Sequence, residues 1–178
     1  MRILILGAGK MGSFFTDVLS FKHETAVYDV NPHKLRFMYN CYRFTKLEEI
    51  EEFRPELVIN AATVKYTLDA FNQVLPVLPK DCIISDIASV KTGLKEWYEG
   101  CGFRYVSTHP MFGPTFANLD QLSTENAIII RKTVAAAKNF AKTTCVMVIG
   151  AESQSVSVFD LRSSAKVRIV SSGIRKIK

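Results

Sequence analysis

Short apolar runs alternate with polar stretches of helical periodicity along the first 130 residues of the chain. The apolar runs are typical of strands buried on both faces, as in a parallel sheet. They predict strands at residues 2–6, 25–28, 56–62, 82–88, 104–110 and 126–130. The stretches between them predict helices at residues 11–21, 31–39, 45–53, 65–78 and 94–102. This alternation indicates an α/β fold built on a doubly wound parallel sheet.

The first strand runs into a glycine turn with G-x-G-x-x-G spacing, formed by Gly7, Gly9 and Gly12. The first glycine permits a tight turn, the second lets a pyrophosphate approach the backbone, and the third lets helix and strand pack closely. Phosphates are then favoured at the positive N-terminal end of the helix that follows. The turn predicts a Rossmann-type dinucleotide-binding fold, and the alternative is a turn that only packs a strand on a helix.

An acidic residue, Asp29, ends the second strand about 20 residues past the glycines, where a carboxylate accepts the hydroxyls of an adenosine ribose. Because it would repel a 2′-phosphate, Asp29 favours NAD over NADP, a preference that nearby Arg36 weakens slightly. The predicted cofactor-binding residues follow three strand ends: Gly7, Ala8, Gly9, Lys10, Met11, Gly12, Asp29, Ala62 and Thr63. Thr63 has an alternative, more ordinary role as the cap of the next helix. No pattern in the sequence indicates a metal site.

Two further polar segments, residues 85–91 and 107–119, follow apolar strands and should meet at the same edge of the sheet. His109 is the predicted catalytic residue, because an imidazole titrates near neutral pH and can accept a hydroxyl proton as hydride leaves the carbinol carbon. Ser89 is predicted to orient a hydrogen bond to His109 or to the substrate, or to cap a helix. Lys91 either binds a carboxylate or pairs at the surface, and Asp86 is expected to organise its loop. The other two histidines, His23 and His33, lie among polar residues and are expected to be inert.

Composition narrows the class of protein. The chain has 178 residues, 48% of them hydrophobic, which suits one compact domain or a domain with part of another. No apolar run approaches the ~20 residues of a membrane helix, and no signal peptide is expected. Four scattered cysteines, at positions 41, 82, 101 and 145, are typical of core thiols in a cytoplasmic protein.

The net charge of +6 is unevenly distributed. Residues 1–130 carry 13 basic and 15 acidic residues, whereas residues 131–178 carry 10 basic and 2 acidic residues. All six prolines also precede position 131. The basic segment has no nucleic-acid-binding motif and few aromatic residues, so specific nucleic-acid binding is not expected.

The segments GAGKMG, YDVNP, SDIASVK and HPMFGPTFANL together resemble the prephenate dehydrogenase family of tyrosine biosynthesis, over about residues 1–130. The resemblance implies NAD-dependent oxidative decarboxylation of prephenate to hydroxyphenylpyruvate, driven by aromatisation of the ring. It implies that Gly7, Gly9 and Gly12 hold the pyrophosphate, that His109 polarises the ring hydroxyl, and that Ser89 assists His109. Many family members have an acidic residue soon after the histidine motif, where this chain has Pro114 and Thr115. An acidic role in that loop is therefore not expected.

Members of this family follow the nucleotide domain with a helical domain that forms a dimer and binds the substrate carboxylates. Residues 131–178 show no long amphipathic helices, so a homodimer is expected only where such a domain is present. Two interpretations remain for this segment. It forms a crossover helix at 131–143 and a last strand at 145–149 of the same domain, or it is out-of-frame or truncated sequence. We predict a dinucleotide-binding domain at 1–130 and an atypical basic tail at 131–178.

Three alternative functions also remain. Arogenate dehydrogenases share the same motifs, so the substrate is prephenate or arogenate. The second alternative is that the chain is an inactive NAD-binding fragment of such an enzyme. A β-hydroxyacid or imine-reducing dehydrogenase is less favoured, because it does not account for SDIASVK and HPMFGP occurring together.

Overall fold

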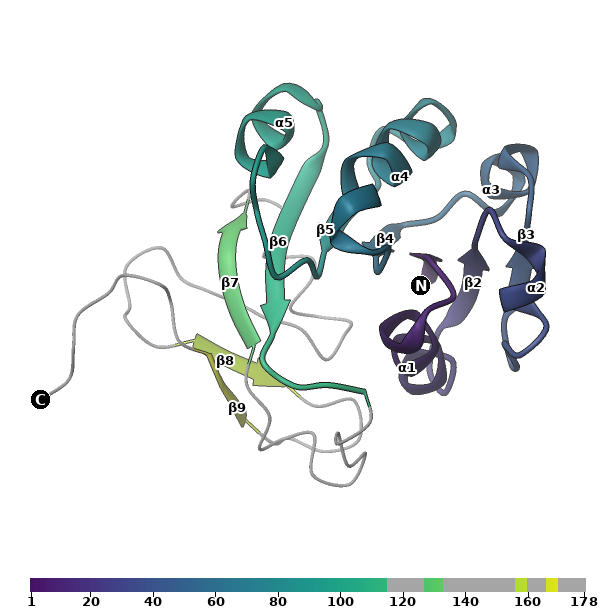
Figure 1. Ribbon diagram of the computed structural model, residues 1–178, viewed down its shortest axis with the longest axis horizontal. Coiled ribbons are helices and arrows are strands. Elements are labelled where there is room, and N and C mark those ends of the chain that lie inside the picture. Colours follow the sequence, from purple (N-terminus) through teal and green to yellow (C-terminus); the bar gives the residue numbers. More distant parts are fainter. Residues whose placement is uncertain (115–126, 133–155, 160–165, 170–178) are drawn as a thin grey trace, which may run out of the picture.

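A central β-sheet organises the molecule. The computed structural model describes residues 1–114, 127–132, 156–159 and 166–169. Within these residues a seven-stranded sheet has the order β3-β2-β1-β4-β5-β6-β7 (Figure 1). Its strands are β1 (Arg2–Leu6), β2 (Glu24–Tyr28), β3 (Tyr42–Phe44), β4 (Leu57–Asn60), β5 (Ile83–Asp86), β6 (Arg104–Pro110) and β7 (Ala127–Lys132). Strands β1 to β6 run parallel, and β7 pairs antiparallel with β6 at the edge. The predicted doubly wound α/β fold is confirmed.

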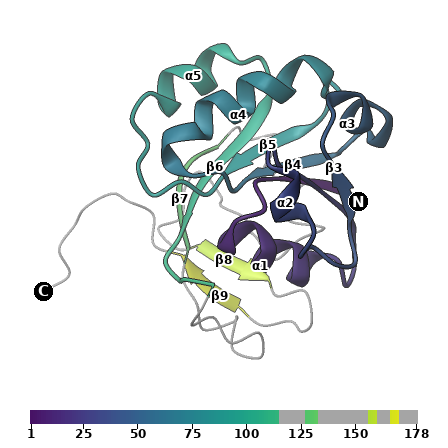
Figure 2. The same cartoon turned by 45° about the vertical axis from the view of Figure 1, so that its right-hand side comes forward.

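Helices cover both faces of this sheet (Figure 2). They are α1 (Lys10–Leu19), α2 (Pro32–Leu35), α3 (Leu47–Phe53), α4 (Thr67–Val74) and α5 (Leu94–Gly100), with 3₁₀ turns η1 (Val64–Tyr66) and η2 (Leu75–Val77). Helix α1 covers one face, and α3, α4 and α5 cover the other. Side chains along β1 alternate between the two faces of the sheet and so contribute to both hydrophobic clusters. Ile3 and Ile5 pack in the cluster with α1, and Leu4 and Leu6 pack in the cluster with α4.

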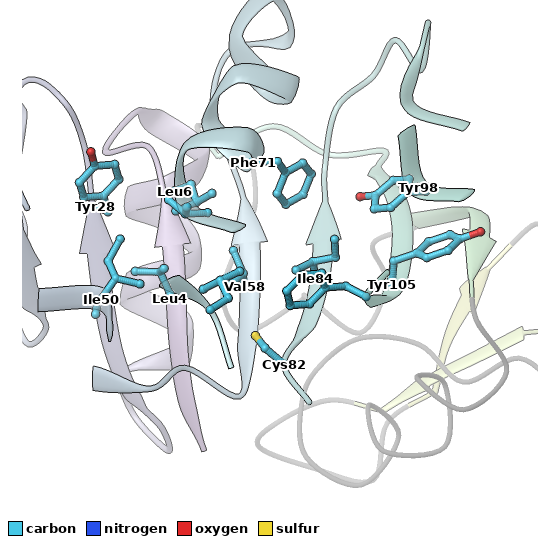
Figure 3. Packing of buried hydrophobic residues seen from close by; sticks show 14 of the residues in the cluster. Leu4, Leu6, Tyr28, Ile50, Val58, Phe71, Cys82, Ile84, Tyr98 and Tyr105 are labelled. Atoms are coloured by element: carbon cyan, nitrogen blue, oxygen red, sulfur yellow. The ribbon is translucent and has the colours of Figure 1, made fainter. Parts of the chain in front are cut away.

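The core under α4 and α5 is rich in aromatic rings (Figure 3). Phe71 of α4 is fully buried and stacks on Trp97 of α5, with ring centroids 4.8 Å apart. Tyr98 of α5 stacks on Tyr105 of β6 at 4.3 Å. Each such pair adds about 0.5–1.5 kcal/mol beyond the area that it buries. These contacts fix α5, and with it the loop between β5 and α5, against the sheet.

The structure differs from the predicted elements at several boundaries. The helix predicted at 31–39 ends after four residues at Leu35, because Phe37 and Tyr39 are exposed and Asn40 has a φ of 54°. The helix predicted at 65–78 is interrupted by 3₁₀ turns at both ends. Strand β3 was not predicted, since its three residues include exposed Tyr42 and form the edge of the sheet.

The C-terminal third is described only in part. Strands β8 (Val156–Phe159) and β9 (Lys166–Ile169) form an antiparallel pair. The last strand predicted in the first domain, β7, continues to Lys132. Most of the helix predicted at 131–143, and the whole strand predicted at 145–149, lie outside the described residues, as does Cys145. The division at residue 130 therefore stays a prediction.

The described residues offer neither a membrane-spanning helix nor a cluster of metal ligands. None of their helices is long and apolar enough to cross a membrane. Within the same part of the chain, no group of three or more His, Cys, Asp or Glu side chains is arranged to hold a metal ion.

Candidate functional site

The predicted site segments leave the sheet at one edge. In the ladder, Leu6 of β1 lies beside Tyr28 of β2 and Asn60 of β4, and the row continues through Asp86 of β5 to Ser107 of β6. These are the carboxyl ends of parallel strands, where open α/β sheets bind their ligands. The glycine turn, Asp29 and the loops after β4, β5 and β6 therefore start from the same line.

The glycine turn joins β1 to α1 in a conformation that requires its glycines. Gly7 has a φ of +97°, and its N–H donates to the Tyr28 carbonyl at 2.8 Å. A Cβ on Gly12 would overlap the carbonyl oxygen of Gly7, so α1 can pack this closely only without a side chain there. Gly9 is the N-cap of α1, no side chain caps this helix end, and a Cβ on Gly9 would meet nothing within 4 Å. The helix start is thus open to a ligand, as a pyrophosphate requires.

Asp29 is held by backbone N–H groups from two loops. One carboxylate oxygen accepts from Ala8 N at 2.8 Å, and the other accepts from Asn31 N at 2.8 Å. The ammonium of Lys34 lies 3.6 Å from Oδ2, and Asp29 is 7% exposed. Each oxygen of an ionised carboxylate has a further acceptor site. Asp29 is therefore fixed in place and still able to accept hydrogen bonds from a ligand.

A cavity of about 230 Å³ lies between the ends of β1, β2 and β4. Five of the predicted cofactor-binding residues line it: Gly7, Gly9, Asp29, Ala62 and Thr63. Tyr66, Asp69 and Gln73 also line it, and sequence reasoning missed them because they match no motif. A positive-φ turn, an open helix start and a fixed carboxylate around one cavity fit a dinucleotide.

The other residues of the glycine turn do not line this cavity. Ala8 and Lys10 line a second, open groove together with Lys34, Arg36 and Pro114. Met11 packs against the core under α1, and Gly12 is buried. The Ala8 N–H is already donated to Asp29, and the cofactor contacts of Ala8, Lys10, Met11 and Gly12 stay predictions.

The loop after β4 is held by an asparagine and not by the predicted threonine cap. Thr63 is the N-cap of η1, but its side chain makes no capping hydrogen bond, so the capping prediction is wrong. Buried Asn60 instead accepts from Ala62 N at 3.1 Å and donates to the Thr67 carbonyl at 2.8 Å. This leaves the exposed Thr63 hydroxyl at the rim of the cavity.

The half-buried residue His109 lies on the part of β6 that extends past the end of β5. It pairs with Ile128 of β7, two positions beyond Ser107. The chain then returns to α1, where the Phe112 ring meets Phe14 with centroids 5.7 Å apart. The segment after His109 therefore packs on the helix that follows the glycine turn.

Ser89 lies exposed in the loop between β5 and α5. Its predicted helix-cap role is wrong, because the N-cap of α5 is Gly93. The hydrogen bonds found among the described residues include none between Ser89 and His109. The catalytic assistance predicted for Ser89 stays a prediction.

Asp86 and Lys91 form an ion pair that contacts Thr108, the residue before His109. Asp86 is fully buried and accepts from the Lys91 ammonium, from Ala88 N at 3.0 Å and from the Tyr98 hydroxyl at 2.8 Å. The expectation that Asp86 organises its loop is confirmed. The Lys91 ammonium pairs with Asp86 inside the protein and not at the surface, while a contact with a substrate carboxylate stays a prediction. Burial lowers the pKa of Lys91, and the charge of Asp86 opposes this shift.

Comparisons with known proteins place the chain in a family. The family model of the prephenate dehydrogenase nucleotide-binding domain matches residues 19–130, beginning after the glycine turn. No protein of curated function matches the chain.

Solved structures share the fold. Prephenate dehydrogenase from Aquifex aeolicus, solved with hydroxyphenyl propionate and NAD+, has a TM-score of 0.64 and 23% identity, covering 75% of this chain and 51% of that one. Arogenate dehydrogenase from Synechocystis has a TM-score of 0.59 and 17% sequence identity. The match covers 73% of this chain and 50% of that one. An imine reductase from Myxococcus stipitatus, solved with NADP+, has a TM-score of 0.64 and 14% sequence identity. The match covers 78% of this chain and 50% of that one. These identities show the fold alone, and the chain spans about half the length of each structure. Because the family model matches more than half of the chain, the protein belongs to the prephenate dehydrogenase family and carries its nucleotide-binding domain.

Proposed function

We propose that this domain binds NAD at the carboxyl edge of its sheet and serves the oxidative decarboxylation of prephenate to hydroxyphenylpyruvate. The observation that carries the proposal is the meeting of two features at one edge. The glycine turn and Asp29 leave β1 and β2, and His109 extends from β6 on a strand whose following loop packs on α1. Family membership supplies the substrate class.

The cofactor's two halves would contact different parts of this edge. The backbone of residues 7–12 binds the pyrophosphate, where the α1 dipole favours negative charge. Asp29 accepts the adenosine ribose hydroxyls, and Ala62 and Thr63 border the same cavity. The charge of Asp29 favours NAD over NADP, while Lys34 and Arg36 at the neighbouring groove reduce the penalty for a 2′-phosphate.

His109 acts at the substrate hydroxyl. A bound nicotinamide supplies the hydride acceptor. His109 accepts the proton of the ring hydroxyl as hydride leaves the carbinol carbon, and polarises the oxygen that becomes part of the product. The bond to the ring carboxylate breaks, carbon dioxide leaves, the bonding pair makes the ring aromatic, and His109 returns the proton to the phenolate oxygen of the product. Ser89 orients the hydrogen bond between His109 and the substrate.

Two alternatives have support of their own. Arogenate is the second substrate candidate, since the fold is shared with an arogenate dehydrogenase. A nucleotide-binding module without catalysis is the second functional candidate, because the chain spans about half of the solved dehydrogenases.

Binding and turnover assays with two cofactors and two substrates distinguish these functions. The purified chain is titrated with NAD and with NADP, and then mixed with prephenate or arogenate while the absorbance of the reduced cofactor is followed. The proposal predicts tighter binding of NAD and NADH formation with prephenate. NADH with arogenate alone would reassign the substrate, and NAD binding without turnover would identify a cofactor-binding module. Absence of binding of either dinucleotide would contradict the proposal as a whole.

A further inference from the structure

The ion pair of Asp86 and Lys91 has several partners inside the protein. Asp86 is fully buried, and Lys91 is 17% exposed. The Lys91 ammonium donates to Asp86 Oδ1, whose other donor is Ala88 N, while Tyr98 donates to Oδ2. A buried pair of this kind is weak evidence for stability, since desolvation offsets much of the attraction. The position of the second Lys91 bond suggests a different role.

That second bond reaches the residue before His109. The Lys91 ammonium donates to the Thr108 carbonyl at 2.6 Å. Thr108 also donates its hydroxyl to the Asp86 carbonyl at 2.8 Å. Thr108 is buried and is therefore held at two points, both at the end of β5 or in the loop that follows it.

The sheet supports this backbone on one side only, because Thr108 and His109 pair with β7 but have no ladder partner on the β5 side within the described residues. Pairing between β5 and β6 ends at Asp86 and Ser107, and the ladder of β6 with β7 shifts register between Ser107 and Thr108. Beyond Ser107, the β5 side of β6 has no ladder partner within the described residues. The Lys91 ammonium supplies a hydrogen bond to this stretch of backbone from the loop after β5.

We propose that Lys91, held by Asp86, is a positioning residue that fixes the backbone of Thr108 and thereby the direction of the His109 imidazole. The proposal rests on His109 acting in the proposed function, but its structural part can be tested without turnover. The proposal gives Lys91 a positioning role, because the two bonds that its ammonium makes go to Asp86 and Thr108.

The test follows the three histidine ring signals of the full chain by NMR. Each signal is assigned with a His→Asn variant. The double variant Asp86→Asn/Lys91→Met removes the ammonium without leaving a buried unpaired charge. It is expected to move the His109 signal and leave those of His23 and His33 in place. Lys91→Arg, which keeps a donor and the charge, should restore most of the original His109 position. Lys95→Met, an exposed residue of α5, is the matched control and should move none of them.

Kinetics provide the second readout. The double variant should lower kcat by about 10- to 100-fold while the KM for NAD stays unchanged, the range expected when a catalytic group is displaced. An unmoved His109 signal would overturn the proposal. Equal movement of all three signals would also overturn it, because the pair would then hold the whole fold. If the wild-type chain produced no NADH, the proposed function would fail, while the ring signals would still decide whether Lys91 positions His109.

Discussion

The two ends of the candidate site are built in different ways. Around β1 and β2, backbone geometry forms the site: a glycine turn, an open helix start and a carboxylate fixed by N–H groups. Around β5 and β6, buried charged side chains fix the backbone that carries His109. The first end should fail when a Cβ is added, and the second when a charge is removed. Substitutions at either end of the site can therefore test this difference.

The largest effect is expected from removing one charge of the buried pair. Lys91→Met leaves the Asp86 carboxylate buried without its counter-ion, and should lower the free energy of unfolding by about 3–5 kcal/mol. Urea denaturation measures it. The double variant Asp86→Asn/Lys91→Met should recover most of this loss. A single variant as stable as the wild type would show that the pair is not the element that supports this end.

The glycine end should fail for steric reasons. Gly12→Ala places a Cβ on the Gly7 carbonyl oxygen, a backbone atom that cannot move freely, and should cost about 3 kcal/mol of stability together with NAD binding. Gly9→Ala is the matched control, because a Cβ there meets nothing within 4 Å. It should keep the stability and weaken NAD, since the methyl group occupies the space in front of the helix start. Equal stability losses in both variants would remove the distinction between packing and ligand approach.

The carboxylate of Asp29 should determine the relative affinity for NAD and NADP. Asp29→Asn removes a charged acceptor from the ribose position, and should weaken NAD binding by about 1.5–3 kcal/mol. NADP binding should weaken less, because the repulsion of the 2′-phosphate is also removed. Calorimetric titration with both cofactors checks the ratio. An unchanged ratio would mean that Asp29 acts only on the glycine turn through Ala8 N.

The smallest effect concerns the β5 side at alkaline pH. Burial raises the pKa of the Cys82 thiol from 9.0 to about 12, so the unfolded chain loses this proton at lower pH than the folded one. Stability is therefore full below pH 9 and is lost as pH rises toward 12, by about 1.4 kcal/mol per pH unit. Burial also raises the pKa of Tyr98, with the same sign above pH 10, whereas the lowered pKa of Lys91 acts in the opposite direction. Unfolding of Cys82→Ala between pH 8 and 10 should show a shallower decline than that of the wild type, and an identical slope would contradict it.

The same contrast explains what the sequence could predict. Glycine spacing and the acid at the end of β2 report backbone geometry, which depends on local sequence, so the glycine turn, Asp29 and the fold class were accessible. The cap of α2 is equally local, since the Asn31 side chain before Pro32 accepts from His33 N at 3.1 Å. The bond of Lys91 to Thr108 joins the loop after β5 to β6, and no periodicity encodes it. Asn60 and Tyr66 likewise gain their positions only when β4 meets α4.

The central claim is that His109 and the dinucleotide site work at one edge of this sheet. The most direct measurement compares NAD affinity and prephenate-dependent NADH formation in the wild type and His109→Asn. His23→Asn is the matched control, because His23 precedes β2 at the opposite end of the strands. We predict that His109→Asn keeps NAD affinity and abolishes NADH formation, while His23→Asn retains both. NADH formation at the wild-type rate in His109→Asn would contradict the account.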